Sequence, residues 1–231
     1  PEACWPQAKC YFWGVQSRHE VDFIIARGRD TIAVEVKAGS RWENKDLSGL
    51  RAFLKTDPHC RAAVLAYHSH NIHGVTYQEN DLVAFAEDLT FLQAEGCNLV
   101  SLSQVAESVI YGHALPDRAV ALSCDDGADY DFIDIFHEAW GEQTSFATML
   151  RQSGQGVLTS FVIADPLARE EIDKKCLAGV GRMNDFWWTD AISSGVLHIG
   201  NHSWDHQHRC LDRYADMPLE RIVLATAGQP E

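Results

Sequence analysis

The sequence has no apolar run that approaches the roughly 18 to 20 residues needed for a membrane-spanning helix. It also has no charged-then-apolar leader, so we expect a cytoplasmic protein without a membrane span. Its seven cysteines include no C-x-x-C pair, which argues against a structural zinc site, and their scattered spacing argues against a disulfide scaffold. Disorder is excluded as the main state because 46% of the 231 residues are hydrophobic, enough for one or two cores.

Positive charge is scarce. Lys and Arg number 19 against 33 Asp and Glu, so the formal net charge is −14. Residues 1–60 carry nine basic and eight acidic residues, whereas residues 61–231 carry ten and 25. The acidic balance argues against nucleic acid as a partner. The shift in charge near residue 60 indicates a boundary between two domains, 1–60 and 61–231.

Hydrophobic periodicity predicts alternating strands and helices. The predicted strands are 9–15, 20–27, 31–38, 61–67, 98–101, 118–124, 157–164 and 196–200. The predicted helices are 43–56, 81–95, 103–111 with Ser103 as a candidate N-cap, 132–140, 143–152, 166–178 and 184–194. The alternation from residue 61 onward is typical of a parallel α/β array.

A first group of candidate site residues lies in the N-terminal strands. Asp22 is in the second predicted strand, and Glu35 and Lys37 share one face of the third because they are two residues apart. Two carboxylates and a lysine can bind Mg²⁺ and help to activate a water for attack on a phosphodiester. The alternative is an exposed strand edge on which these charges are solvated.

The arrangement of these residues resembles the PD-(D/E)xK nuclease-like fold. The stretch YFWGVQSRHEVDFIIARGRDTIAVEVKAG, followed by DLSGLRAFLKTDP, is similar to the C-terminal domain of many prokaryotic AAA-type ATP-binding proteins. This resemblance covers about residues 9–66 and implies a partial PD-(D/E)xK-like domain over 1–60, with Mg²⁺ as an ion for Asp22, Glu35 and Lys37. The chain has no Walker A motif of its own.

A second group follows two later strands. Asp125 and Asp126 come directly after an apolar strand, where parallel α/β proteins bind ligands. His202 and His206 follow another strand, and their i, i+4 spacing predicts two imidazoles on one helical face, a metal-binding geometry. Two histidines and one carboxylate leave room for a water at a zinc or iron ion. Taken singly, the acidic pair also fits a helix N-cap and the histidine pair a solvated helix face.

The two motifs in this order resemble those of the polysaccharide deacetylase family, the NodB-homology type of carbohydrate esterase. The stretch LTFLQAEGCNLVSLSQVAESVIYGHALPDRAVALSCDDG resembles the approach to the first family motif, and HIGNHSWDHQH contains an H-(S/T)-x-x-H motif. VLAYHSHNI and TSFVIADP resemble other strands of that family, so the likeness covers about residues 61–213. It implies a partial (β/α) barrel preceded by the small nuclease-like sheet.

The resemblance also implies the role of each residue. Asp125 is the expected general base, and Asp126, His202 and His206 are the expected metal ligands, with Zn²⁺ as the expected ion and iron, cobalt or nickel as alternatives. Ser203 is expected to steady the histidine loop by hydrogen bonding. The implied reaction is removal of an N- or O-acetyl group from an acetylated polysaccharide or oligosaccharide, with a metal-bound water as nucleophile.

The family's later strands supply an arginine that orients the base and a histidine that acts as general acid. The sequence ends at Glu231, soon after the second motif, so we expect a C-terminally truncated deacetylase domain. The alternatives are a nuclease-like or non-catalytic DNA-related module and an inactive fragment. Residues 61–67 fit both resemblances, and no Gly, Ser or Pro-rich linker separates the two segments.

Other histidines and tryptophans are weaker candidates. His68 follows a strand and is a candidate for the substrate pocket, as is Trp204 between the two motif histidines. His70 and His73 lie in a polar stretch and are expected to be solvated or hydrogen-bonded. Trp187 and Trp188 fall in a predicted helix and are expected to belong to the core.

Overall fold

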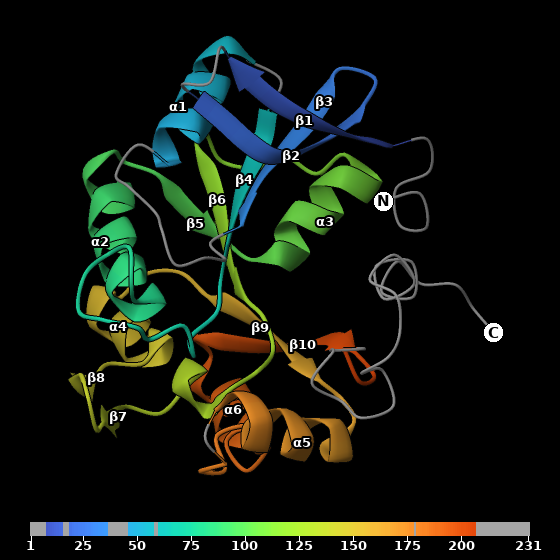
Figure 1. Ribbon diagram of the computed structural model, residues 1–231. Helices are drawn as coiled ribbons and strands as arrows, with labels where there is room; N and C mark the ends of the chain where they lie inside the picture. The colour runs from blue at the N-terminus through green and yellow to red at the C-terminus, as the bar shows by residue number, and fades with distance from the viewer. Residues whose placement is uncertain (1–7, 16–18, 37–45, 58–59, 178, 207–231) are drawn as a thin grey trace.

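The computed structural model describes residues 8–15, 19–36, 46–57, 60–177 and 179–206 (Figure 1). The strands are β1 (Lys9–Val15), β2 (His19–Arg27), β3 (Asp30–Val36), β4 (Cys60–Tyr67), β5 (Asn98–Val100), β6 (Ala119–Cys124), β7 (Ile135–His137), β8 (Gly141–Gln143), β9 (Leu158–Ile163) and β10 (Leu197–Ser203). The helices are α1 (Asp46–Thr56), α2 (Asp81–Ala94), α3 (Leu102–Tyr111), the 3₁₀ helix η1 (Asp129–Asp131), α4 (Phe146–Ser153), α5 (Pro166–Cys176) and α6 (Trp188–Ser194). Within these ranges no helix is long and apolar enough to cross a membrane.

One mixed sheet contains every described strand except β7 and β8. Its order is β1-β2-β3-β4-β6-β9-β10, and β5 pairs with β6. The first three strands are antiparallel to one another, whereas β3, β4, β6, β9 and β10 run parallel in succession. β5 pairs with the first half of β6, and β9 pairs with its last residues. In the described part of the chain the sheet is open, and no pairing of β1 with β10 closes it into the expected barrel.

Strand β4 belongs to both predicted segments. It pairs with β3 on one side, where Val34 lies opposite Val64, and with β6 on the other, where Leu65 lies opposite Leu122. Six consecutive residues of β4 are buried, as expected for a parallel strand that is covered on both faces. The predicted division near residue 60 therefore coincides with the start of a strand inside a continuous sheet.

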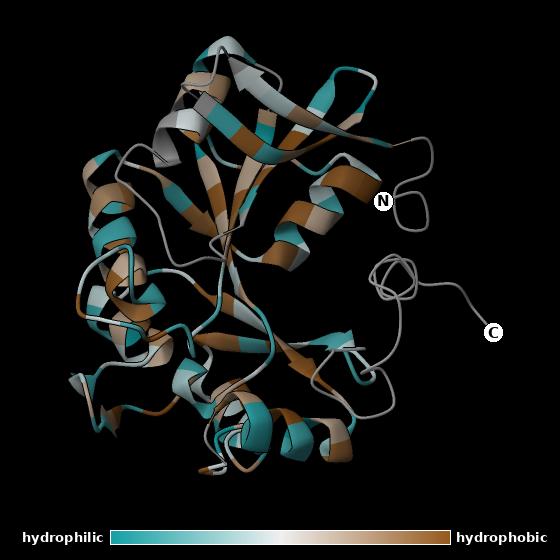
Figure 2. Ribbon diagram, viewed as in Figure 1, coloured by the Kyte–Doolittle hydropathy of each residue, from teal (hydrophilic) through white to brown (hydrophobic). Residues whose placement is uncertain are grey.

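Alternate residues of the central strands face two different hydrophobic clusters. Ala63 and Leu65 of β4 contribute to a large cluster that also takes in residues of α1, α2, α4, α5 and α6. Ala62 and Val64 contribute to a smaller cluster with Val105 and its neighbours on α3. Figure 2 shows hydrophobic residues concentrated on these central strands.

The large cluster includes three aromatic side chains that bring α2 and α4 against the end of β4. The ring of Phe85 lies 4.5 Å from that of Phe146 and 5.1 Å from that of Tyr67, centroid to centroid. All three side chains are fully buried. Rings in tilted or edge-to-face contact add about 0.5–1.5 kcal/mol to the free energy gained by burying their area.

Most predicted elements are present, and two local predictions were wrong. The N-cap of α3 is Ser101, not Ser103, and Ser101 forms a capping box with Gln104. Residues 132–140 are not a helix, because β7 and β8 form a short antiparallel hairpin there. Gly141, with φ +73°, begins the return strand, and Asp134 accepts hydrogen bonds from the backbone and hydroxyl of Ser145, which fixes the base of the hairpin.

We expect Phe85→Ala to lower the free energy of unfolding by about 3–5 kcal/mol, because the variant leaves a cavity between α2, α4 and β4. Urea unfolding followed by circular dichroism measures this loss. Phe136→Ala is the matched control, since Phe136 is 69% exposed on the hairpin and its loss should change stability by about 0.5 kcal/mol or less. Equal effects of the two substitutions would contradict the described core.

Candidate metal centre

The parallel strands end at one edge of the sheet, and the segments that follow them carry the candidate residues. Asp125 follows β6, and its N–H donates to the carbonyl of Tyr67 at the end of β4. The segments after β9 and β10 are joined in the same way, because the N–H groups of Ala164 and Asp165 donate to the carbonyls of Ser203 and Trp204. The backbone thus holds all four segments side by side.

Asp126 and Gly127 form a turn that needs left-handed backbone at two successive positions, with φ +71° and +76°. A Cβ on Gly127 would lie 2.5 Å from a methyl carbon of Val162, so only glycine fits there. Left-handed backbone at a residue other than glycine is costly and is concentrated at functional sites. The turn brings the carboxylate of Asp126 to the segment that follows β10.

Asp126, His202 and His206 converge. Oδ1 of Asp126 lies 3.5 Å from Nε2 of His202 and 3.5 Å from Nε2 of His206. One ligand atom from each residue lies within 4.8 Å of the other two. Ligands about 2.0–2.1 Å from a tetrahedral zinc ion lie about 3.3–3.4 Å from one another, so these spacings fit such an ion.

The environment of Asp126 also fits a cation. Its Oδ1 is buried and has no hydrogen-bond partner among the described residues. Burial opposes ionisation, but His70, His206, His68 and His202 together outweigh it and lower the pKa of Asp126. A carboxylate that is ionised and buried, with one oxygen facing two imidazoles, is a set of donors suited to a divalent metal.

The two histidines do not lie on a helix, as their spacing had predicted. His202 is in β10, which continues to Ser203, and His206 is in the following turn with φ +62°. The imidazole rings stack, with centroids 4.8 Å apart. The hydroxyl of Ser203 accepts a 2.7 Å hydrogen bond from the N–H of His206, which holds the turn closed.

His70 is a member of the site that the sequence reasoning missed. Its Nε2 lies 3.6 Å from Oδ2 of Asp126, on the side of the carboxylate opposite to His202 and His206. Burial lowers the pKa of His70 to about 4, although Asp126 raises it, so its imidazole is neutral near pH 7. The signal available in the sequence was its position three residues after a buried strand.

Asp125 has a different environment from its neighbour. Burial raises the pKa of Asp125, although His202 and His68 lower it. His68 is half-buried, and its N–H donates to Oδ2 of Asp81 at 2.7 Å. Trp204 is 64% exposed. The substrate-binding roles expected for His68 and Trp204 stay predictions.

A cavity of about 50 Å³ lies beside the cluster. Its lining combines three cluster residues with a wall that is mainly apolar: His70, Asp126, His206, Ile163, Ile172, Cys176, Leu177 and Met183. A water molecule takes about 30 Å³ in the liquid, so the cavity can hold only a small group. A larger groove of about 310 Å³ lies between α2 and α4, but its lining includes none of the cluster residues.

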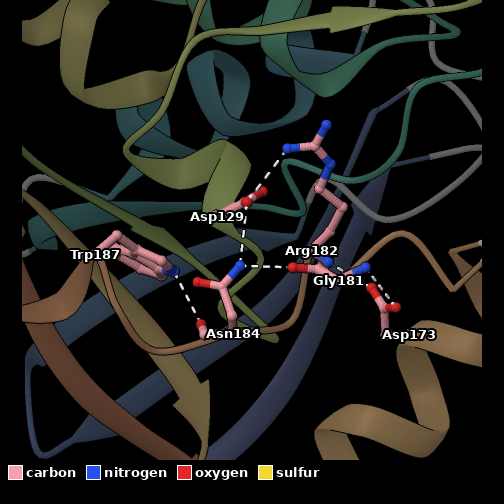
Figure 3. A network of polar contacts seen from close by, with 6 residues as sticks. All are labelled: Asp129, Asp173, Gly181, Arg182, Asn184 and Trp187. Carbon is pink, nitrogen blue, oxygen red and sulfur yellow. Dashed lines mark hydrogen bonds and ion pairs between the residues drawn. The ribbon is translucent and has the colours of Figure 1, made fainter.

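A polar network fixes the segment that carries Met183 (Figure 3). Asp173 of α5 accepts hydrogen bonds from the backbone N–H groups of Gly181 and Arg182, at 2.8 and 2.6 Å. Asp129 of η1 accepts from the amide of Asn184 at 3.2 Å and contacts the guanidinium of Arg182 at 3.4 Å. The same network anchors Asn184, whose carbonyl accepts from the indole N–H of Trp187. Trp187 is 1% exposed, as the prediction of a core residue required.

The nuclease-like residues lie at the other end of the sheet order. Phe23 pairs with Val34, and this antiparallel register continues to place Asp22 beside Glu35 on adjacent strands. Glu35 is 2% exposed, and Asp22 is partly buried. Lys37 lies outside the described residues. A Mg²⁺ site at this position therefore stays a prediction.

Comparisons with known proteins give a family of undefined function and several solved structures. The matching family model, described as a domain of unknown function (DUF4143), covers residues 3–86. No curated protein matches. The family match spans the nuclease-like segment, β4 and the histidines that follow β4, and its description assigns them no activity.

The solved structures similar to this chain include three deacetylases. They are a de-N-acetylase from Aggregatibacter actinomycetemcomitans (19% identity, TM-score 0.44), IcaB from Ammonifex degensii (21%, 0.45) and the BpsB deacetylase domain from Bordetella bronchiseptica (17%, 0.37). They cover 64%, 68% and 53% of this chain, which spans 56%, 58% and 44% of theirs. At these scores the functional argument rests on the side chains of this chain.

We expect the chain to bind about one equivalent of Zn²⁺, and His202→Ala or His206→Ala to abolish tight binding. Loss of a ligand should weaken affinity by more than the roughly 10- to 100-fold that loss of an outer-shell partner costs. Elemental analysis and chelator competition measure content and affinity. His198→Ala is the matched control, because His198 is exposed on the same strand β10. Zinc retained in both ligand variants would contradict the site.

Proposed function

We propose that this chain is a metal-dependent hydrolase of the polysaccharide deacetylase type. The observation that carries the proposal is the convergence of Asp126, His202 and His206 at one edge of the sheet. These three residues are the ligands that the DDG and H-S-x-x-H motifs imply, and they come from segments far apart in the sequence. The proposed substrate is an N- or O-acetylated polysaccharide or oligosaccharide.

The chain's own groups divide the work in this proposal. Asp126, His202 and His206 hold the ion, with Zn²⁺ first and iron, cobalt or nickel as alternatives. The ion, when bound, supplies Lewis acidity at the acetyl carbonyl and lowers the pKa of water. Asp125, held next to it by the hydrogen bond from its N–H to Tyr67, is the proposed general base.

The surroundings of the cluster support hydrolysis of a small acyl group. The apolar wall of the cavity limits access of bulk water to Asp126. The exposed indole of Trp204, between the two histidines, is a proposed contact for a sugar ring, and His68 is a proposed second contact on the opposite segment. The proposal leaves the partial barrel and the 1–60 and 61–231 division as sequence-based expectations.

We expect Asp125→Asn to keep Zn²⁺ affinity near that of the wild type and to slow acetate release from N-acetylglucosamine oligomers. The loss should be roughly 10²- to 10⁴-fold, because the amide cannot accept a proton as a carboxylate does. Acetate release by the zinc-loaded chain is the measurement. Asp190→Asn, an exposed position on α6, is the control.

Two outcomes would contradict the proposal in different ways. Wild-type activity in Asp125→Asn would remove Asp125 from the role of base while leaving the metal centre in place. Zinc binding without any acetate release by the wild-type chain would favour the inactive fragment.

A further inference from the structure

A fully buried carboxyl group lies close to the metal centre and has no part in the proposed chemistry. Asp131 ends η1, five residues after Asp126, and has no exposed surface. Its Oδ2 accepts a 2.6 Å hydrogen bond from the hydroxyl of Ser160. The hydroxyl of Ser69 and the thiol of Cys124 also interact with this carboxyl group. All four side chains are completely buried.

The three partners of Asp131 come from three segments that form the site. Ser69 follows β4 and separates His68 from His70 in the sequence. Cys124 ends β6 immediately before the acidic pair and lies opposite Ser160 of β9 in the sheet register. Ser160 also lies opposite Ile199 of β10, the strand that contains His202. One carboxyl group therefore touches the ends or the interior of three neighbouring strands.

This arrangement is costly for the core. A buried carboxyl group loses its hydration, and burial raises the pKa of Asp131 to about 6. The groups that favour its ionised form are the neutral Ser160, Ser69 and Cys124 side chains. Apolar residues of similar volume would fill such a position at less cost. What they could not supply is direction, because hydrogen bonds to one carboxyl group fix the partners at defined positions around it.

We propose that Asp131 is a positioning residue that sets the loop after β4 and the DDG turn in the arrangement that forms the metal centre. Through Ser69 it places His70 against Oδ2 of Asp126. Through Cys124 it fixes the residue from which the DDG turn begins. This inference rests on the proposed function, because it concerns the same metal centre, but it adds a residue that touches neither metal nor substrate.

The test is the Zn²⁺ affinity of Asp131→Asn in the full chain. The substitution keeps the side-chain volume but replaces one accepting oxygen with an NH₂ donor, which mismatches donors that face it. We expect zinc affinity to fall roughly 10-fold, at the lower end of the range for outer-shell partners. Competition with a chromogenic chelator, well below the unfolding temperature, measures it without relying on activity. Ser160→Ala removes only one donor and is expected to lower affinity in the same direction.

Val105→Ala is the matched control for general destabilisation. Val105 is buried in the smaller cluster beneath α3, so its loss weakens the fold without touching the network of Asp131. We expect this variant to bind Zn²⁺ as the wild type does. Wild-type affinity in both Asp131→Asn and Ser160→Ala would overturn the proposal even if both variants were less stable.

The two proposals fail in different ways. If the wild-type chain bound no Zn²⁺, or if the His202→Ala and His206→Ala chains bound it unchanged, the metal centre itself would be overturned. If the wild type and the histidine variants behaved as expected and only the Asp131 and Ser160 variants matched the wild type, the positioning role alone would be lost. If Asp131→Asn did not fold, Ser160→Ala would decide the question.

Discussion

The parallel pairing of β4, β6, β9 and β10 is the constraint on which the candidate metal centre depends. Parallel strands end at the same edge of a sheet, so residues that follow them in sequence are brought together in space. Asp126 and His202 meet for this reason, although helices α4, α5 and α6 lie between them in the chain. The same rule places His70 nearby, since it follows the neighbouring strand β4.

Features that weaken a fold are concentrated at this edge. Asp126 and His206 adopt left-handed backbone, and Oδ1 of Asp126 and Nδ1 of His70 are buried without hydrogen-bond partners in the described chain. Each feature costs free energy, which the aromatic contacts of Phe85 and Phe146 and the apolar faces of the central strands offset. Local conflict with the rules of a stable fold is typical of a functional site.

The sequence predicted the elements whose signal is local. The apolar run at 61–67 and the periodic pattern at 81–95 correspond to β4 and α2, because burial on one or both faces leaves a direct imprint on residue order. The segment 132–140 was wrong for the opposite reason. Its apolar residues fit a helical period, whereas its hairpin is fixed by the contact of Asp134 with Ser145 and by the backbone of Gly141.

The same distinction applies to the candidate site. The motif spacing identified Asp126, His202 and His206, but i, i+4 spacing is equally compatible with a strand that runs into a turn, and the turn depends on the hydrogen bond to Ser203. His70 could not be found by spacing, because its relation to Asp126 exists only once β4 lies beside β6. The buried group around Asp131 is likewise a product of strand register, since Cys124 and Ser160 become neighbours only in the sheet.

Two adjacent carboxyl groups with opposite surroundings give the site its chemical asymmetry. Burial dominates at Asp125 and raises its pKa, although His202 and His68 oppose the shift. Burial is outweighed at Asp126, where His70 and His206 contribute most to lowering the pKa. Environments that move the pKa values of neighbouring carboxyl groups apart separate a group that exchanges a proton from one that stays charged. The fold thereby supports the proposed division between a base at Asp125 and a metal ligand at Asp126, and it does so through the loop after β4, which brings both His68 and His70 to the pair.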